Sequence, residues 1–289
     1  MNQPSYAEHF FQSRDGLKLY YRDYAGAQDK LPVLCLHGLT RDSRDFDFLA
    51  QRLAPQRRLI VPDQRGRGRS QHDRRWYNYQ PAVYIDDMWT LLNELKLARV
   101  IIIGTSLGGL MGIAMASLRR TAIAALVLND VGPEIDPDGL ARIRSYVGRF
   151  PEVCTWEQAS QQLREMFATA FPDFDDASWM QFARRTFAED ENGLPRPSSD
   201  PAIGDAMRAI PMPPGATQAM WFAFASLRGM PMLAFRGERS DLLSAATFDR
   251  MQREVPGLIR VTVPNRGHPP QLDEPVCVEA IEAFLAGCE

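Results

Sequence analysis

Short apolar runs recur along the chain and alternate with longer segments in which apolar residues follow the helical period. The short runs predict strands at residues 8–12, 17–24, 32–36, 59–61, 100–103, 124–128, 231–235 and 258–263. The helical period predicts helices at residues 43–53, 81–97, 107–118, 215–228, 244–254 and 275–286. Strands that alternate with helices form a mostly parallel sheet covered on both faces, so the pattern predicts an α/β fold.

The alternation stops between residues 133 and 214, where no run of buried-strand character occurs. We interpret residues 133–214 as an inserted helical subdomain, and residues 1–132 and 215–289 as the core. The insertion is rich in large aromatic residues, which are Phe150, Trp156, Phe167, Phe171, Phe174, Trp179, Phe182 and Phe187. These are too many for a short polar lid, so some should form a small core of the insertion itself.

Composition narrows the class of protein without identifying it. The 289 residues are 45% hydrophobic and 24% charged, with a formal net charge of −3, as in an ordinary globular protein. This charge gives no reason to expect nucleic acid or an anionic membrane as a partner. No apolar run approaches the roughly 18 residues of a membrane-spanning helix, and residues 1–10 lack the pattern of a signal peptide. We therefore expect a cytoplasmic protein.

The cysteines do not predict a disulfide framework or a metal site. None of them has C-x-x-C spacing, and they are scattered at Cys35, Cys154, Cys277 and Cys288. We interpret them as buried or incidental thiols in a reducing compartment.

An arginine-rich loop follows the predicted strand at 59–61. Its arginines, which could hold an anion, are Arg65, Arg67, Arg69, Arg74 and Arg75. Asp63 at the strand end and glycines at alternate positions indicate a tightly turning loop instead. We therefore expect these arginines to point to solvent, as charged runs usually do.

The strongest motif lies between the strand at 100–103 and the helix at 107–118. Residues 104–108 read Gly-Thr-Ser-Leu-Gly and fit the pattern G-x-S-x-G. A serine on a sharp strand-to-helix turn presents its hydroxyl above the sheet, and a Cβ at either flanking glycine would collide with a neighbouring element. This context predicts that Ser106 is a nucleophile.

A serine hydroxyl needs a base to take its proton, and near neutral pH that base is usually histidine. The chain has four candidates, His9, His37, His72 and His268. His9 lies in an edge strand, His72 in the arginine-rich loop, and His37 heads a loop whose backbone has another use. His268 directly follows the last strand, at the carboxyl edge where an open α/β sheet places its sites. We predict His268 as the base.

An acid on a loop at the carboxyl end of a strand should orient the histidine. Asp130 and Asp241 both fit this requirement. One helix and one strand separate Asp241 from His268, a spacing that suits convergence above the sheet. Asp130 could simply cap the entry to the insertion. We therefore favour Asp241 and keep Asp130 in reserve.

The tetrahedral intermediate of acyl transfer requires two backbone N–H donors. One should be Leu107, which follows the nucleophile at the start of a helix. The second should come from the loop after the strand at 32–36, and by position it is Leu39.

These motifs together resemble the α/β-hydrolase fold family over essentially the whole chain. The matching segments are His37-Gly38, Asp63-x-Arg65-Gly66-x-Gly68-x-Ser70, Gly104-x-Ser106-x-Gly108-Gly109, Asp241 and Gly267-His268. The resemblance implies an eight-stranded, mostly parallel sheet flanked by helices, with an antiparallel second strand. It also implies a helical cap after the sixth strand and a triad acid after the seventh. The acid loop, Gly237-Glu238-Arg239-Ser240-Asp241, is one residue longer than the usual Gly-x-x-Asp.

These residues favour a serine esterase or lactonase of small to medium substrates, acting through Ser106, His268 and Asp241. The cap aromatics that face Ser106 should favour short to medium neutral acyl groups. A C–C bond hydrolase of ring-cleavage products is the alternative, and a ligand-binding protein that keeps only the fold is less favoured. The chemistry implies no cofactor and no metal. The expected partner is a small-molecule ester or lactone, and the sequence leaves a homo-oligomer open.

Overall fold

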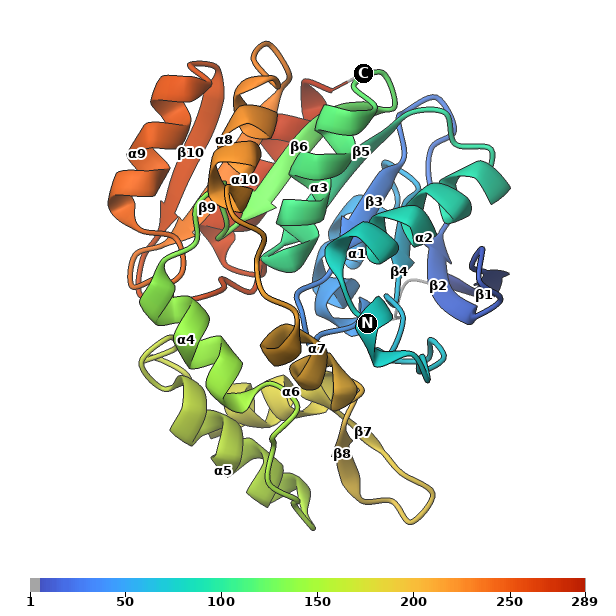
Figure 1. Cartoon of the computed structure of the whole chain (residues 1–289), viewed down its shortest axis with the longest axis vertical. Coiled ribbons are helices and arrows are strands. Elements are labelled where there is room, and N and C mark those ends of the chain that lie inside the picture. The colour runs from blue at the N-terminus through green and yellow to red at the C-terminus, as the bar shows by residue number, and fades with distance from the viewer. Residues whose placement is uncertain (1–5, 289) are drawn as a thin grey trace.

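The sheet has the architecture that the resemblance implies. In the computed structural model, which describes residues 6–288, eight strands form the main sheet in the order β1-β2-β4-β3-β5-β6-β9-β10 (Figure 1). Strand β2 is antiparallel to both of its neighbours, and the other pairs are parallel. The strands are β1 (Tyr6–Gln12), β2 (Lys18–Tyr24), β3 (Val33–Leu36), β4 (Leu59–Pro62), β5 (Val100–Thr105), β6 (Ile123–Asn129), β9 (Met232–Gly237) and β10 (Leu258–Val263). The predicted α/β-hydrolase fold is confirmed.

Helices cover both faces of this sheet. The helices of the core are α1 (Asp47–Leu53), α2 (Pro81–Glu94), α3 (Leu107–Leu118), α8 (Ala216–Ala225), α9 (Ala245–Glu254) and α10 (Pro275–Ala286). Helices α2, α3, α8 and α9 pack on one face, and α1 and α10 pack on the other. Alternate residues of each central strand enter the two layers, and both layers are buried. This explains why the central strands read as continuous apolar runs.

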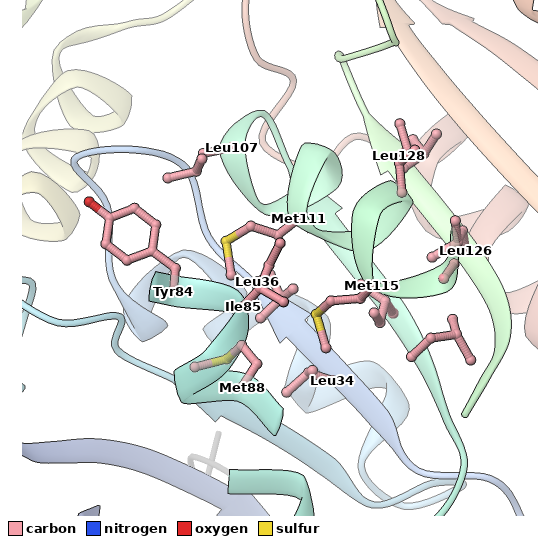
Figure 2. Close-up of a cluster of buried hydrophobic side chains, with 14 of the residues drawn as sticks. Leu34, Leu36, Tyr84, Ile85, Met88, Leu107, Met111, Met115, Leu126 and Leu128 are labelled. Carbon is pink, nitrogen blue, oxygen red and sulfur yellow. The ribbon is translucent and has the colours of Figure 1, made fainter. Parts of the chain in front are cut away.

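The layer between α2, α3 and the sheet supports the turn that carries Ser106. Met88 of α2 and Met111 and Met115 of α3 lie against Leu34 and Leu36 of β3 (Figure 2). All five side chains are buried. The elements on either side of the strand-to-helix turn are therefore fixed by close packing.

A cap is inserted between β6 and β9 and lies beyond one end of the sheet (Figure 1). It contains α4 (Pro137–Tyr146), α5 (Trp156–Phe167), α6 (Asp176–Thr186), α7 (Ala202–Ala209) and a hairpin of β7 (Phe187–Glu189) and β8 (Pro195–Pro197). The chain then returns to the core, where α8 packs on α3. The cap has its own apolar core, made by Val153, Ala159, Leu163, Phe171, Trp179, Phe182, Ala183 and Phe187. The aromatic residues of the insertion therefore do form a core of their own.

The arginine-rich loop corrects one prediction. Arg69, Arg74 and Arg75 are exposed, as expected, but Arg65 and Arg67 are fully buried. Arg65 forms ion pairs with three carboxylates, which are Asp15, Asp73 and Asp87. Asp15 and Asp87 come from the β1–β2 turn and from helix α2, so local sequence could not reveal these partners. Their pairing with the guanidinium allows its burial.

The structure also bears on the expectations about membrane-spanning helices and about the four cysteines. Among the described residues, no helix is long and apolar enough to span a membrane. Cys35, Cys277 and Cys288 are buried thiols, whereas Cys154 is exposed, and all four are unpaired. Residues 1–5, part of the stretch expected to lack a signal peptide, lie outside the described residues.

Candidate active site

Ser106 lies on the sharp turn that the motif predicts. The residue joins β5 directly to α3 and adopts a positive φ of 51°. A Cβ on Gly108 would lie 2.0 Å from the carbonyl oxygen of Leu36, and one on Gly104 would lie 2.4 Å from the carbonyl oxygen of Gly108. Glycine is therefore required at both positions, because this backbone approach leaves no room for a side chain.

His268 is hydrogen-bonded to Ser106, as the sequence predicts. Its Nε2 lies 2.9 Å from Ser106 Oγ, and its Nδ1 lies 2.8 Å from Oδ2 of Asp130. A carboxylate can only accept a hydrogen bond, so Nδ1 carries the proton and Nε2 accepts the serine hydroxyl. This tautomer can act as a general base toward Ser106.

The structure corrects the predicted acid from Asp241 to Asp130. Asp241 instead forms a bidentate ion pair with Arg142 of cap helix α4. Partial burial disfavours the charged carboxylate, but the Arg142 guanidinium outweighs that effect and lowers the pKa of Asp241. Asp130, held in reserve by the sequence argument, is completely buried beside His268.

The loop after β9 supplies donors to Asp130 rather than the acid itself. Oδ1 of Asp130 accepts the backbone N–H of Gly237 at 2.8 Å, and Oδ2 accepts the Ser240 hydroxyl at 2.6 Å. Counted from Gly237, Ser240 occupies the fourth position, where the Gly-x-x-Asp pattern places an acid. A serine at that position was a sequence signal against an acid in this loop, but it did not by itself identify Asp130.

The predicted oxyanion donors flank the serine. Leu107 is the first residue of α3, so its N–H lies at the positive end of the helix dipole. Gly38 passes beside the nucleophile, since a Cβ built on it would lie 3.9 Å from Ser106 Cβ. Within residues 6–288, neither the Leu39 N–H nor the Leu107 N–H donates a hydrogen bond to a protein acceptor. Both N–H groups are therefore available for a ligand oxygen.

Two buried side chains fix the loop that carries Leu39. His37 Nδ1 donates to the carbonyl of Gly38 at 2.8 Å, and Nε2 accepts the N–H of Gln64 at 3.0 Å. Arg67 Nε donates to the carbonyl of Leu39 at 2.8 Å. In a trans peptide the C=O and the N–H point in opposite directions, so the bond to the Gly38 carbonyl also sets the direction of the Leu39 N–H. His37 and Arg67 thus hold in place the loop of residues 37–40, which is the predicted oxyanion loop.

The burial of His37 should make the stability of the protein depend on pH. Burial lowers the pKa of His37 to about 4. An unfolded chain takes up a proton on this residue near pH 6.5, whereas the folded protein does not. The contribution of neutral His37 to the free energy of unfolding is therefore fully present above about pH 6.5. It is lost as the pH falls toward 4. His37→Gln should remove up to about 3 kcal/mol of this loss. Urea unfolding of both proteins at pH 7 and pH 4.5 measures the difference.

The buried carboxyl group of Asp63 changes stability with pH in the opposite direction, but it does not affect the comparison of wild type with His37→Gln. Burial, with the neighbouring Asp42 carboxylate, raises the pKa of Asp63 to about 6. A raised carboxyl pKa makes stability fall as the pH rises from about 4 to 6. Asp63 is present in both proteins, so its contribution cancels. Parallel pH profiles for wild type and His37→Gln would contradict the assignment of His37.

Ser106 and His268 line a cavity of about 90 Å³ under the cap. Its cap wall is mainly apolar, with Ile143, Val147, Phe150, Phe167, Phe171 and Phe182 beside the hydroxyl-bearing Tyr146 and Thr186. Some cap aromatics thus do face Ser106. The core wall carries the polar groups Thr40, Arg41, Asp45 and Gln271, none of which the sequence argument singled out. Arg41 lies only two residues after Leu39 in the sequence. This closeness to a predicted oxyanion donor was the signal that could have placed Arg41 in the site.

Within the part of the chain that the structure describes, no set of three or more His, Cys, Asp or Glu side chains could hold a metal ion. The arrangement can activate a serine hydroxyl, stabilise an oxyanion and hold a mainly apolar substrate in a small cavity.

Comparison with known proteins assigns the chain that carries this site to a family. Residues 32–275 match the model of the alpha/beta hydrolase fold. The chain is 31% identical over 275 residues to the 3-hydroxybutyrate-oligomer hydrolase of Cupriavidus necator, with 93% of each protein covered. It is 26% identical to the 2-(acetamidomethylene)succinate hydrolase of Mesorhizobium japonicum, with 88% of this chain and 87% of the relative covered. A crystal structure of an alpha/beta hydrolase from Novosphingobium aromaticivorans superposes with a TM-score of 0.92 at 40% identity, covering 99% of each chain. This chain belongs to the alpha/beta hydrolase family.

Proposed function

We propose that this protein hydrolyses carboxylic esters or lactones of small to medium size through an acyl-enzyme on Ser106. The observation that carries the proposal is the unbroken hydrogen-bonded chain from Asp130 through His268 to Ser106 at the wall of the cavity. A buried acid, a histidine in the reactive tautomer and a half-buried turn serine that lines the cavity are the three parts that acyl transfer requires.

In the proposed reaction, His268 Nε2 takes the hydroxyl proton as Ser106 Oγ attacks the ester carbonyl. The N–H groups of Leu39 and Leu107 stabilise the oxyanion that forms. Asp130 keeps Nδ1 protonated and stabilises the imidazolium, which then gives its proton to the leaving alcohol. Water, deprotonated by the same histidine, attacks the acyl-enzyme and releases the acid.

The substrate class follows from the cavity and from the family relatives. The apolar cap wall favours an uncharged acyl group, and the small space favours short chains. The relative from Cupriavidus necator is a 3-hydroxybutyrate-oligomer hydrolase. Its substrate class combines a short, uncharged acyl unit with an ester bond, which suits this cavity. We therefore propose short hydroxy-acid esters as the substrates to test first.

A substrate panel tests this proposal against the alternatives. The panel comprises p-nitrophenyl esters of increasing chain length, simple lactones, a 3-hydroxybutyrate dimer and carboxylate-bearing vinylogous diketones. We expect kcat/KM to be highest among short esters and to fall for long-chain esters, because the cavity cannot enclose a long acyl chain. Reactions with Ser106→Ala give the background rate.

Two results of the panel would overturn the proposal. A preference for the diketones of about tenfold or more, equivalent to about 1.4 kcal/mol of transition-state stabilisation, would favour the C–C hydrolase. Tight binding of panel compounds without turnover would favour a ligand-binding protein. Such a protein would have no need of the Asp130–His268–Ser106 chain.

A further inference from the structure

One charged pair interrupts the otherwise mainly apolar wall of the catalytic cavity. Arg41 and Asp45 form a salt bridge there, and only 14% and 23% of their side chains are exposed. The hydroxyl of Thr186, at the end of cap helix α6, accepts a further hydrogen bond from Arg41. Keeping charges in a desolvated cavity is costly unless they are well paired. The proposed reaction assigns no role to this pair.

Arg41 lies beside the nucleophile. A Cβ built on Gly38 would lie 3.4 Å from Arg41 Cγ and 3.9 Å from Ser106 Cβ, so the two side chains flank the same glycine. Gly38 also belongs to the oxyanion loop. A group bound by Arg41 would therefore belong to the same small molecule whose carbonyl meets Ser106.

The guanidinium of Arg41 is fixed in position but retains free donors. Nε and Nη2 bind the Asp45 carboxylate at 2.9 and 2.6 Å, and Nη1 binds Thr186. The ring of Phe182 lies 4.9 Å from the guanidinium carbon. A guanidinium has five N–H donors, so one N–H on each Nη atom is left without a protein acceptor among the described residues. Arg41 lines the cavity, and two free N–H donors on one guanidinium suit a carboxylate.

We propose that Arg41 determines specificity by binding a free carboxylate on the alcohol half of the substrate. The substrate class is then the ester of one short hydroxy acid with the hydroxyl of another, cleaved next to the free carboxyl end. The acyl half of such a molecule is uncharged and suits the aromatic cap wall. The carboxylate lies a few bonds from the ester oxygen and meets Arg41. This inference rests on the proposed function.

The test compares two substrates that differ only in charge. They are the 3-hydroxybutyrate dimer with a free carboxylate and the same dimer with a primary carboxamide. We expect wild type to cleave the acid with a kcat/KM at least about tenfold higher than the amide. Arg41→Gln should reduce this ratio to about 1. The ratio isolates the contact, because general damage to the protein slows both substrates alike.

Two further variants keep the result interpretable. Arg164→Gln removes an exposed arginine of cap helix α5 that pairs with Asp176, and its ratio should equal that of wild type. Asp45→Asn removes the anion that competes for Arg41, so its ratio should exceed the wild-type ratio. If Arg41→Gln does not fold, the Asp45→Asn ratio decides. A ratio equal to or below that of wild type would overturn the inference.

Failure of the inference can be told apart from failure of the proposed function. If wild type cleaves acid and amide equally and Ser106→Ala cleaves neither, the esterase stands and the role of Arg41 is wrong. If wild type cleaves neither dimer nor any neutral ester of the panel, the proposed function and the inference fall together.

Discussion

Ser106→Ala is expected to lower kcat for ester hydrolysis by about 10⁴-fold or more. The variant lacks the oxygen of the proposed acyl-enzyme, while the proposed oxyanion donors and the cavity remain. A fluorophosphonate probe should label wild type once and should not label the variant. Kinetics on the best ester of the panel and mass spectrometry of the labelled protein measure the two effects.

A serine on the same helix provides the matched control. Ser117 lies on α3 but is exposed and outside the cavity. Ser117→Ala should keep both the label and the turnover of wild type. Labelling that persists in Ser106→Ala would place the nucleophile elsewhere. Thermal unfolding should show that both variants remain folded.

Asp130→Asn is expected to lower kcat by about 10⁴-fold, with little change in the fold. The amide of asparagine can donate to Nδ1 of His268, which favours the tautomer whose Nε2 carries the proton. That nitrogen then cannot accept the hydroxyl proton of Ser106. The kcat of Asp130→Asn on the best ester of the panel, measured beside wild type, tests this expectation.

Asp241→Asn is the matched comparison, because Asp241 follows the next strand of the sheet and lies in the loop that holds Asp130. Asp241 bonds to Arg142 rather than to His268. Its substitution should therefore change kcat far less than that of Asp130. The reverse ranking of the two variants would return the role of the acid to Asp241.

Short-range patterns in the sequence were sufficient to predict most of the architecture and two residues of the hydrogen-bonded chain, Ser106 and His268. Buried parallel strands read as continuous apolar runs, so the central strands could be found without knowing their neighbours. Ser106 was recognisable because a strand, two glycines and a helix impose one turn geometry on consecutive residues. His268 was recognisable because few histidines exist and only one directly follows the last strand. Each of these conclusions depends on residues close together in the chain.

Only the tertiary structure decided which acid meets the histidine. Asp130 and Asp241 both follow strands at the correct edge of the sheet, so spacing could not rank them. The conformations of two loops decided the contact: Asp130 adopts a positive φ of 54°, and Ser240 and Gly237 donate to its carboxylate. The same limit applies to Arg65, whose burial depends on carboxylates from distant segments, and to Arg41, whose place in the cavity depends on the docking of the cap. Long-range pairing of polar groups leaves little trace in local sequence, because each partner alone has the composition of an ordinary surface loop.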